Sequence, residues 1–228
     1  AAFLLPISAR SVAGLDVLAG AWEARLADPD APVADLCAAA ALRRAHLPHR
    51  LTVAGRDRPG LLAALDAWRA GDAGHPGWAA GHSDGPARLA FVFSGHGGHW
   101  VGMGRALLAG DPIFARAFHD CEAALARLSP GTSLLAALTA ADAEDRWRSK
   151  SVLHPLMLAL QVSTAAVWLL RWGVAPAAIV GHSSGELAAA VVAGALPLDD
   201  AFRVSLARCA MIERIVGQGA MAVVGLPP

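Results

Sequence analysis

The sequence predicts an α/β protein with a parallel sheet, preceded by a small α+β unit. In the second half of the chain, short β-branched runs alternate with longer helical segments, which is typical of a parallel sheet. One such run leads into Gly-x-Ser-x-Gly at residues 181–185, and an alanine-rich segment of helical spacing follows it. Hydrophobic residues make up 55% of the 228 residues and charged residues only 17%, so the chain can bury a sizeable core.

The first unit, residues 1–86, is expected to contain two strands and three helices. Ser8 or Ser11 is placed to cap the first helix, and Pro48 ends the second because the residue before a proline disfavours helical geometry. No motif that carries chemistry occurs in this unit. We expect strands at residues 3–8 and 50–54, and helices from Ser11 to Leu26, from Val33 to about His46, and from Asp57 to Trp68.

A glycine-rich segment from Gly71 to Gly85 predicts a linker or surface loop between the two units. It carries His75 and His82. A metal site formed by these two histidines is the less favoured interpretation, because neither a cysteine nor a cluster of carboxylates accompanies them. We therefore expect solvated loop histidines here, and no metal site in the protein.

The second unit, residues 87–228, opens with an apolar strand over residues 88–93 that runs into a glycine-rich loop over residues 94–105. Gly95 and Gly97 follow the strand as in a dinucleotide-binding loop, but Trp100 stands where that motif needs its third glycine. The sequence also lacks the Gly-Lys-Ser/Thr of a Walker phosphate loop. Nucleotide binding is therefore disfavoured.

The rest of this unit is expected to alternate between helices and strands. Asp199 and Asp200 are placed to cap the last long helix, which carries Arg203 and Arg208 and which Gly217 ends. The further expected elements are a helix from Asp111 to Ser129, a polar surface segment at 140–150, a buried helix from Pro155 to Trp172, a strand before Gly181, a helix at 187–192 and a strand at 220–224.

Composition limits the partners and the compartment. The formal net charge is zero, with 19 basic and 19 acidic residues, and no basic stripe with interleaved aromatics occurs, so we expect no nucleic acid partner. Three widely spaced cysteines and no recognisable signal peptide predict a reducing, cytoplasmic compartment without disulfides. Polar residues interrupt the apolar segment from Pro155 to Trp172, so we expect a buried helix and no membrane span.

The Gly-x-Ser-x-Gly motif predicts a nucleophile at Ser183. A tight turn between a strand and a helix exposes the hydroxyl, and Gly181 and Gly185 fit because the strand and the helix approach too closely for a Cβ. The backbone N–H of Ser184 would then lie at a helix N-terminus, where it can stabilise the oxyanion that forms when Ser183 attacks a carbonyl.

These motifs resemble those of the malonyl/acyl-CoA:acyl-carrier-protein transacylases, and in particular the acyltransferase domain of modular type I polyketide synthases. Residues 93–104 (FSGHGGHWVGMG) are similar to the family's opening glycine loop, and residues 154–161 (HPLMLALQ) to its Gln-Pro-Ala…Ala-Leu-Gln helix. Residues 180–186 (VGHSSGE) with 192–196 (VAGAL) match its nucleophile segment closely. Residues 1–86 resemble the linker domain that joins a ketosynthase to an acyltransferase.

The resemblance implies a partial hydrolase-like acyltransferase core and a two-step transfer. Ser183 takes the acyl group of a malonyl-type acyl-CoA, and the phosphopantetheine thiol of an acyl carrier protein then removes it, with no bound cofactor. Backbone N–H groups of His96 and Ser184 hold the oxyanion, and Arg208 holds the free carboxylate. Supporting roles fall to Gly95, Gly97, Gly181, His182 and Gly185. The implied partners are the acyl carrier protein and the adjacent ketosynthase domain.

Histidines replace glutamines of the family at three positions, His96, His99 and His154. A backbone donor at residue 96 does not depend on the side chain, but the charge of a histidine varies near neutral pH. The family's general base is a histidine well downstream of the nucleophile, and no histidine follows His182 here. We therefore expect a C-terminally truncated domain that is catalytically crippled on its own.

Two other hypotheses stay open. A serine esterase or thioesterase of the α/β-hydrolase class shares Gly-x-Ser-x-Gly, but its triad histidine follows the serine, and Arg208 and the glycine loop have no role in it. A non-catalytic docking or spacing element fits residues 1–86, where we find no chemistry. The sequence does not distinguish between malonyl and branched malonyl groups.

Overall fold

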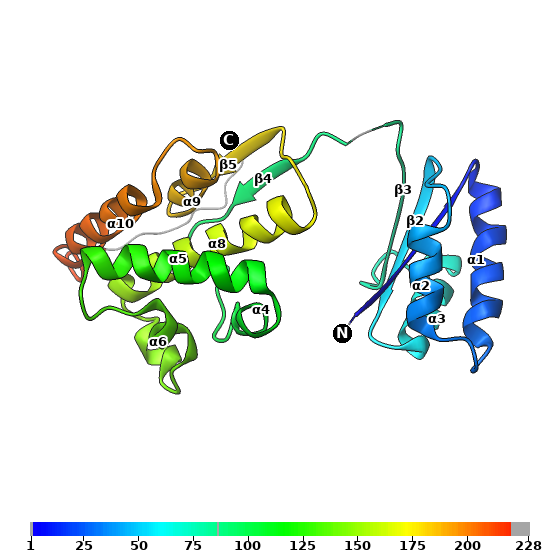
Figure 1. Cartoon of the computed structure of the whole chain (residues 1–228), viewed down its shortest axis with the longest axis horizontal. Helices are drawn as coiled ribbons and strands as arrows, with labels where there is room; N and C mark the ends of the chain where they lie inside the picture. The colour runs from blue at the N-terminus through cyan, green and yellow to red at the C-terminus, as the bar shows by residue number, and fades with distance from the viewer. Residues whose placement is uncertain (1, 86, 220–228) are drawn as a thin grey trace. The chain divides into compact units, whose positions relative to one another are not determined.

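The computed structural model describes residues 2–85 and 87–219. These residues fall into two compact units, with the division between Ala87 and Arg88 (Figure 1). Each unit has a hydrophobic core of its own. Helices and strands therefore occur together in two separately packed parts, of which only the second has a parallel sheet.

The first unit is a three-stranded antiparallel sheet with three helices packed on it. Leu5 and Val53 pair across the first two strands, and both are fully buried. The strand order is β1 (Phe3–Ala9), β2 (His49–Gly55) and β3 (Trp78–His82), and the helices are α1 (Val12–Ala27), α2 (Val33–Leu42) and α3 (Arg58–Arg69).

Side-chain caps set the starts of two of these helices. The hydroxyl of Ser11 accepts from Gly14 N at the start of α1, and the carboxylate of Asp57 accepts from Gly60 N at the start of α3. α2 ends at Leu42, four residues before the expected end near His46. Ser8 provides the reason, because its hydroxyl binds the backbone of Ala45 and Leu47 and so holds this segment against β1.

The expected loop from Gly71 to Gly85 contains a strand, so that prediction was wrong in part. β3 pairs with β2 over five residues, with His82 opposite His49. Four of its five residues are exposed, so the strand has no buried face that would give a hydrophobic alternation. Backbone pairing with the free edge of β2 forms it, and this pairing leaves no signal in the sequence.

The second unit is built around a two-stranded parallel sheet and one central helix. β4 (Ala90–Phe93) pairs in parallel with β5 (Ala178–Gly181), with Val92 opposite Val180. The long helix α8 contacts α5, α6, α9 and α10 (Figure 1). The helical elements are α4 (Arg105–Gly110), α5 (Pro112–Leu128), α6 (Leu134–Thr139), α7 (Ala143–Arg146), α8 (Lys150–Ala166), the π-helical turn η1 (Val167–Arg171), α9 (Gly185–Val192) and α10 (Leu198–Glu213).

The helix from Lys150 to Arg171, which is α8 continued by η1, is long and apolar enough to cross a membrane. Within this unit, 56% of its apolar window is buried by other parts of the protein. Leu156, Ala159 and Leu160 lie in the core cluster together with Phe114 and Phe202 of the neighbouring helices. The helix thus forms the centre of the second unit, as the polar interruptions in its sequence predict.

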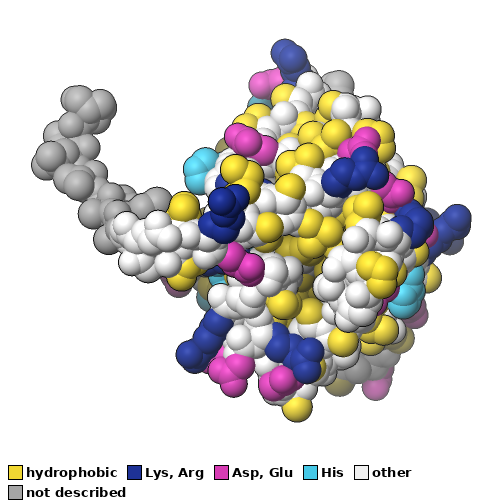
Figure 2. Space-filling view, turned by 90° about the vertical axis from the view of Figure 1, so that its left-hand side faces the viewer, with side chains coloured by type: hydrophobic (Ala, Val, Ile, Leu, Met, Phe, Trp, Pro, Cys, Tyr) yellow, Lys and Arg dark blue, Asp and Glu magenta, His cyan; other side chains and the backbone are white. Residues whose placement is uncertain are grey.

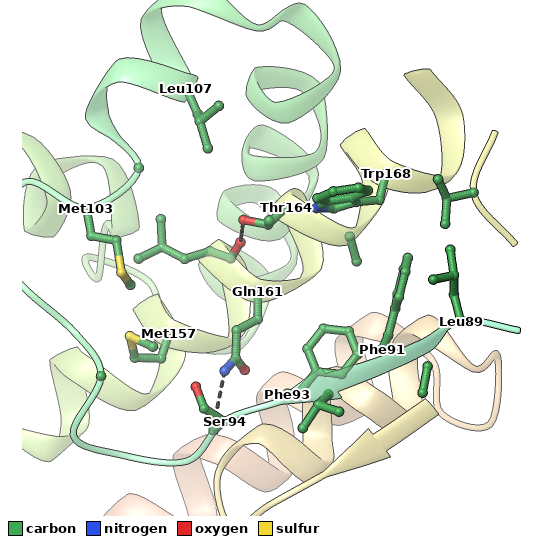
Figure 3. Close-up of a pocket in the computed structure, with 17 residues that line it drawn as sticks. Leu89, Phe91, Phe93, Ser94, Met103, Leu107, Met157, Gln161, Thr164 and Trp168 are labelled. Carbon is green, nitrogen blue, oxygen red and sulfur yellow. Dashed lines mark hydrogen bonds between the residues drawn. The ribbon is translucent and has the colours of Figure 1, made fainter. Parts of the chain in front are cut away.

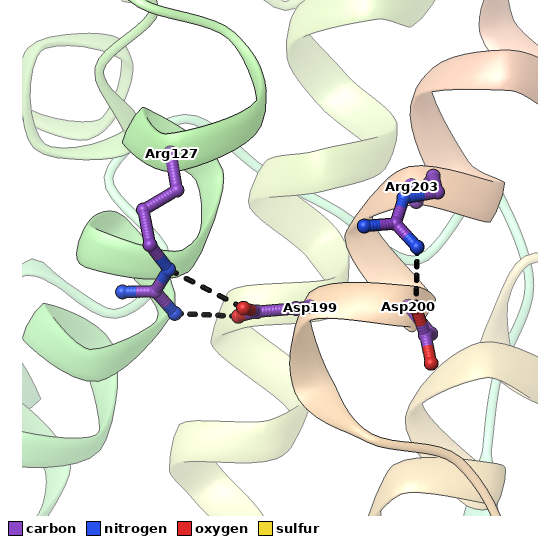
Figure 4. Close-up of polar contacts among 4 residues, drawn as sticks. All are labelled: Arg127, Asp199, Asp200 and Arg203. Atoms are coloured by element: carbon purple, nitrogen blue, oxygen red, sulfur yellow. Dashed lines mark hydrogen bonds and ion pairs between the residues drawn. The ribbon is translucent and has the colours of Figure 1, made fainter.

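Two expectations for this unit need correction. The segment at 140–150 is not simply polar surface, because it forms α7 and buries Trp147, whose Nε1 donates to Ala137 O at 2.8 Å. Asp199 and Asp200 do not cap α10, whose N-cap is Pro197. Their carboxylates instead pair with Arg127 of α5 and Arg203 of α10 (Figure 4).

Gly217 lies beyond the end of α10 at Glu213, and the strand expected at 220–224 lies outside the described residues. On the face shown in Figure 2, positive and negative side chains are interspersed with hydrophobic atoms, with no gathering of one sign. This distribution agrees with the balanced charge of the sequence.

Candidate active site

Ser183 lies in the turn between β5 and α9 with a backbone φ of 54°. It has the only positive φ among the non-glycine residues that the structure describes. This conformation costs on the order of 1–3 kcal/mol and persists only where the surroundings impose it. Hydrogen bonds on both sides of the serine do so: His182 N donates to Phe93 O at 2.9 Å, and Gly185 N donates to His182 O at 2.9 Å.

The glycines on either side of the turn lie where no side chain fits. A Cβ on Gly185 would lie 2.3 Å from Phe93 O, and a Cβ on Gly181 would lie 2.4 Å from Glu186 Cα. Both obstacles are backbone atoms, which cannot rotate away as a side chain can. Close packing between β4, β5 and α9 therefore requires glycine at both positions.

The glycine-rich loop after β4 runs directly against this turn. A Cβ on Gly95 would lie 3.0 Å from His182 Nδ1 and 3.1 Å from Ser183 Cβ. The start of the loop is fixed from α8, because Gln161 Nε2 donates to Ser94 O at 2.7 Å (Figure 3). Gly97 has a φ of 122° and open space around it, so its contribution is backbone conformation.

Arg208 of α10 reaches the same place from the other side. Its Nη2 lies 3.5 Å from Ser183 Oγ, at the limit of a hydrogen bond. The neighbouring residue fixes the position of α10, because Cys209 Sγ contacts Lys150 O at 3.3 Å. In the described part of the chain, Arg208 has no carboxylate partner, and no other side chain hydrogen-bonds Ser183.

The structure thus brings Ser183, Ser184, Gly95 and Arg208 together from three segments that are far apart in the sequence: the turn before α9, the glycine-rich loop after β4, and α10. Ser184 is the N-cap of α9, so its backbone lies at the positive end of that helix. His182 is exposed, and its ring lies against Gly95. Among the described residues, no imidazole hydrogen-bonds Ser183 Oγ.

Sequence reasoning overlooked Lys150, which it assigned to the polar surface segment. Lys150 Nζ lies 3.0 Å from His96 Nε2, and the ring of His96 lies 4.7 Å from that of His99 and 6.0 Å from that of His154. Burial, and then the charge of Lys150, lower the pKa of both His96 and His154. A spacing of four residues between Lys150 and His154 was the one available signal, because it places them on one helix face.

A cavity of about 500 Å³ flanks the edge of β4 that does not pair with β5 (Figure 3). The polar side chains that line it are those of Ser94, Gln161 and Thr164. Neither Ser183 nor Arg208 lines it. The cavity therefore borders the glycine loop without containing the serine. Its apolar lining includes Phe91, Met103, Leu107, Met157 and Trp168.

In the part of the chain that the structure describes, no group of three or more histidine, cysteine, aspartate or glutamate side chains could hold a metal ion. The linker histidines have other partners: His75 Nδ1 accepts from Gly77 N at 3.1 Å, and His82 Nδ1 lies 3.0 Å from Asp84 Oδ1. The groups that the site presents for chemistry are the strained serine and the arginine beside it.

Known proteins match both units. Residues 90–228 match the family model described as acyl transferase domain, and residues 3–65 match a model described as CurL-like, PKS C-terminal. The chain is 40% identical over 226 residues to polyketide synthase GfsA of Streptomyces halstedii, which covers 97% of this chain and 3% of the relative. It is 43% identical over 214 residues to a mycocerosic acid synthase-like polyketide synthase of Mycobacterium tuberculosis, covering 90% and 10%.

Solved structures agree with this relationship. The acyltransferase domain from module 8 of the salinomycin polyketide synthase superposes with a TM-score of 0.79 at 35% identity, covering 96% of this chain and 56% of that one. The acyl transferase domain of SpnD, in complex with 2-(pent-4-yn-1-yl)malonyl, superposes with a TM-score of 0.74 at 30% identity, covering 93% and 49%. The chain thus spans about half of these solved domains and, for the two synthases named above, 3% and 10% of their length.

The matched acyl transferase model covers more than half of the chain and includes β4, the turn of Ser183 and Arg208. The polyketide synthase domains at 35% and 30% identity share its fold, including the α/β hydrolase-like core that the sequence predicts. The chain therefore belongs to the acyl transferase domain family, in the form that modular polyketide synthases contain.

Proposed function

We propose that this chain loads a malonyl-type acyl group from coenzyme A onto an acyl carrier protein through an ester on Ser183. The hydroxyl attacks the thioester carbonyl, coenzyme A leaves as the thiol, and the proton of Ser183 passes to a general base. The phosphopantetheine thiol of the carrier protein then attacks the ester and restores the serine. No bound cofactor takes part in either step.

One observation carries the proposal: the guanidinium of Arg208 lies 3.5 Å from Ser183 Oγ and has no carboxylate partner among the described residues. In a malonyl ester, a single methylene separates the ester carbonyl from the free carboxylate. A guanidinium beside the ester oxygen is therefore within reach of that carboxylate and can bind it with two parallel hydrogen bonds. An acetyl ester offers no such partner.

Two backbone amides are suited to hold the oxyanion of the tetrahedral intermediate. Ser184 N lies at the positive end of α9, directly after the nucleophile. His96 N follows Gly95, which packs against Ser183 Cβ. Among the described residues, no imidazole hydrogen-bonds Ser183 Oγ.

We infer a structural role for the first unit, as the linker between a ketosynthase and this acyltransferase. Residues 3–65 match a model described as PKS C-terminal, and the described part of the unit contains no cluster like that around Ser183. We also infer a cytoplasmic location for the whole chain. Its three cysteines, Cys37, Cys121 and Cys209, are all buried and unpaired, which is typical of proteins in a reducing compartment.

The test is acylation measured by intact mass. The 228-residue chain and a longer form that continues past Pro228 are each incubated with malonyl-CoA and with acetyl-CoA. We expect a malonyl adduct on the longer form and none on its Ser183→Ala variant. Arg208→Lys should lower malonyl loading by about 10- to 150-fold, the loss expected for a charged, two-point hydrogen bond, and leave acetyl loading unchanged.

An adduct that persists in Ser183→Ala would refute the nucleophile. Acetyl loading that equals malonyl loading in the parent would remove the role of Arg208. Hydrolysis of simple esters without transfer to a carrier protein would favour the esterase hypothesis instead.

A further inference from the structure

Beside Arg208 lies a group of cationic and titratable side chains that the acyl transfer itself does not use. We call His96, His99, His154 and Lys150 the imidazole cluster. Lys150 Nζ lies 3.0 Å from His96 Nε2, and the ring centroids of His99 and His154 lie 4.7 Å and 6.0 Å from that of His96. The cluster joins the glycine loop to the first two turns of α8.

The hydrogen bond from Lys150 fixes the charge of its partner. An ammonium group only donates, so His96 Nε2 must accept, and the single proton of this neutral imidazole lies on Nδ1. His99 Nδ1 is buried and has no hydrogen-bond partner in the described part of the chain. The cluster therefore holds a donor or acceptor site that the protein itself leaves unfilled.

The cluster continues into the site of Ser183. Lys150 O accepts from Cys209 Sγ at 3.3 Å, which places the first turn of α8 against α10 at the residue after Arg208. The charge of Arg208 acts on His154. A guanidinium, an ammonium and three imidazoles thus adjoin one another within reach of the serine.

The cluster has no countercharge among the described residues. The side chains whose charge acts on His96 or His154 are Lys150, Arg208 and neighbouring histidines, and none of them is a carboxylate. The carboxylates nearest in sequence to Lys150, Ser183 and Arg208 are Glu144, Asp145, Glu186 and Glu213. Among the described residues, none of them forms an ion pair with the cluster or with Arg208, although the charge of Glu213 acts on Cys209.

Two other arginines near the start of α10 are neutralised. Arg127 bonds both carboxylate oxygens of Asp199, and Arg203 bonds Asp200 (Figure 4). Arg208 lies one and a half turns further along the same helix without such a partner. Arg208 therefore differs from these two arginines in having a charge that no carboxylate of the described part compensates.

We propose that Arg208 and the imidazole cluster form one anion pocket, in which binding of a carboxylate is coupled to uptake of a proton by His154. The carboxylate adds the negative charge that the pocket lacks, and an imidazole can then take a proton from solvent. No covalent bond changes in this step. The identity of the acyl group that carries the carboxylate rests on the proposed function. The existence of the anion pocket does not depend on it.

The coupling makes affinity depend on pH. In the free protein, burial and Lys150 lower the pKa of His154 and His96, so both are neutral at pH 7. A bound carboxylate raises the pKa of the imidazole beside it. If one proton enters per anion, the dissociation constant falls by up to about tenfold for each unit that the pH is lowered between the two pKa values.

The test uses the 228-residue chain labelled with ¹³C in its histidine rings, titrated by NMR from pH 5.5 to 8.5. The probe is monomethyl malonate, an ester with one free carboxylate. Dimethyl malonate is the matched uncharged control, and sodium chloride at equal ionic strength controls for screening. Variants His96→Gln and His154→Gln assign the signals, and His119 on the exposed face of α5 is an internal reference.

We expect monomethyl malonate to raise the titration midpoint of His154, and the other two additions to leave it unchanged. The midpoint of His119 should not move. The dissociation constant of the probe should tighten as the pH falls in the parent, and this dependence should weaken in His154→Gln. An unchanged midpoint of His154, or an equal change in sodium chloride, would overturn the proposal.

The same titration separates this proposal from the proposed function. If Ser183 is never acylated and the midpoints still move, the anion pocket stands and the transferase proposal fails. If Ser183 is malonylated and the midpoints stay fixed, the transferase proposal stands and the coupled pocket fails.

Discussion

Replacing Gly185 with alanine puts a methyl group against the backbone of β4. The new Cβ would lie 2.3 Å from Phe93 O and 2.6 Å from Ser94 O. To restore a separation of 3.0 Å, the strand must move away by about 0.7 Å, and Phe93 O is also the acceptor of His182 N–H. Overpacking of this kind costs about 2–3 kcal/mol, and weakening the hydrogen bond adds about 1 kcal/mol.

The matched control is Gly98→Ala in the glycine loop, where the nearest obstacle is Ser94 Oγ at 4.0 Å and the expected cost is within about 0.5 kcal/mol. Urea unfolding followed by hydrogen exchange and mass spectrometry measures each unit separately. Gly185→Ala should lower protection in β4, β5 and α9 while the peptides of β1 and β2 keep theirs. Equal stability of the two variants would refute the packing argument for the turn.

Three further predictions rest on single contacts. Ser183→Gly removes the cost of a positive φ and should raise the free energy of unfolding by about 1 kcal/mol, measured by urea unfolding; a loss of stability would contradict the strain. Glu122→Gln weakens a carboxylate that accepts from Ser133 Oγ and from two backbone amides at the start of α6, and should cost about 1–2 kcal/mol, seen as faster hydrogen exchange in α6. Burial, Lys150 and neighbouring charges lower the pKa of His154, so the unfolded chain binds this proton more readily than the folded chain does. The free energy of unfolding should therefore fall as the pH drops through about 6.5, and it should fall less in His154→Gln. An equal change in urea midpoint between pH 7.5 and pH 5.5 in the parent and in His154→Gln would contradict this.

Local signals in the sequence predicted most of the fold. Ser11 and Asp57 cap helices where their side chains indicated, and Asp111 caps α5 by accepting from Ile113 N and Phe114 N. The apolar run before Gly181 forms a strand that pairs in parallel with the run before Ser94. Each of these features depends on residues within a few positions of one another, so a short stretch of sequence is enough to predict it.

The predictions that failed concern contacts between distant segments. β3 forms only because β2 offers a free edge, and Trp147 is buried only because its indole N–H finds Ala137 O. Asp199 resembles a helix cap in sequence, but Arg127, 72 positions away, takes its carboxylate. Lys150 carried no motif, and its place beside His96 depends on how α8 packs under the glycine loop. No local pattern encodes such pairs.

Two features of the site lower the stability of the folded chain in the absence of a bound acyl group. Ser183 is held at a φ of 54°, and Arg208 and Lys150 bring uncompensated positive charge together beside it. Ser183→Gly should therefore stabilise the chain and abolish acylation, and His154→Gln should reduce the loss of stability at low pH while it weakens the pH dependence of anion binding. If instead both variants lost stability together with function, these residues would support the fold, and the turn and the cluster would not be strained for the sake of binding.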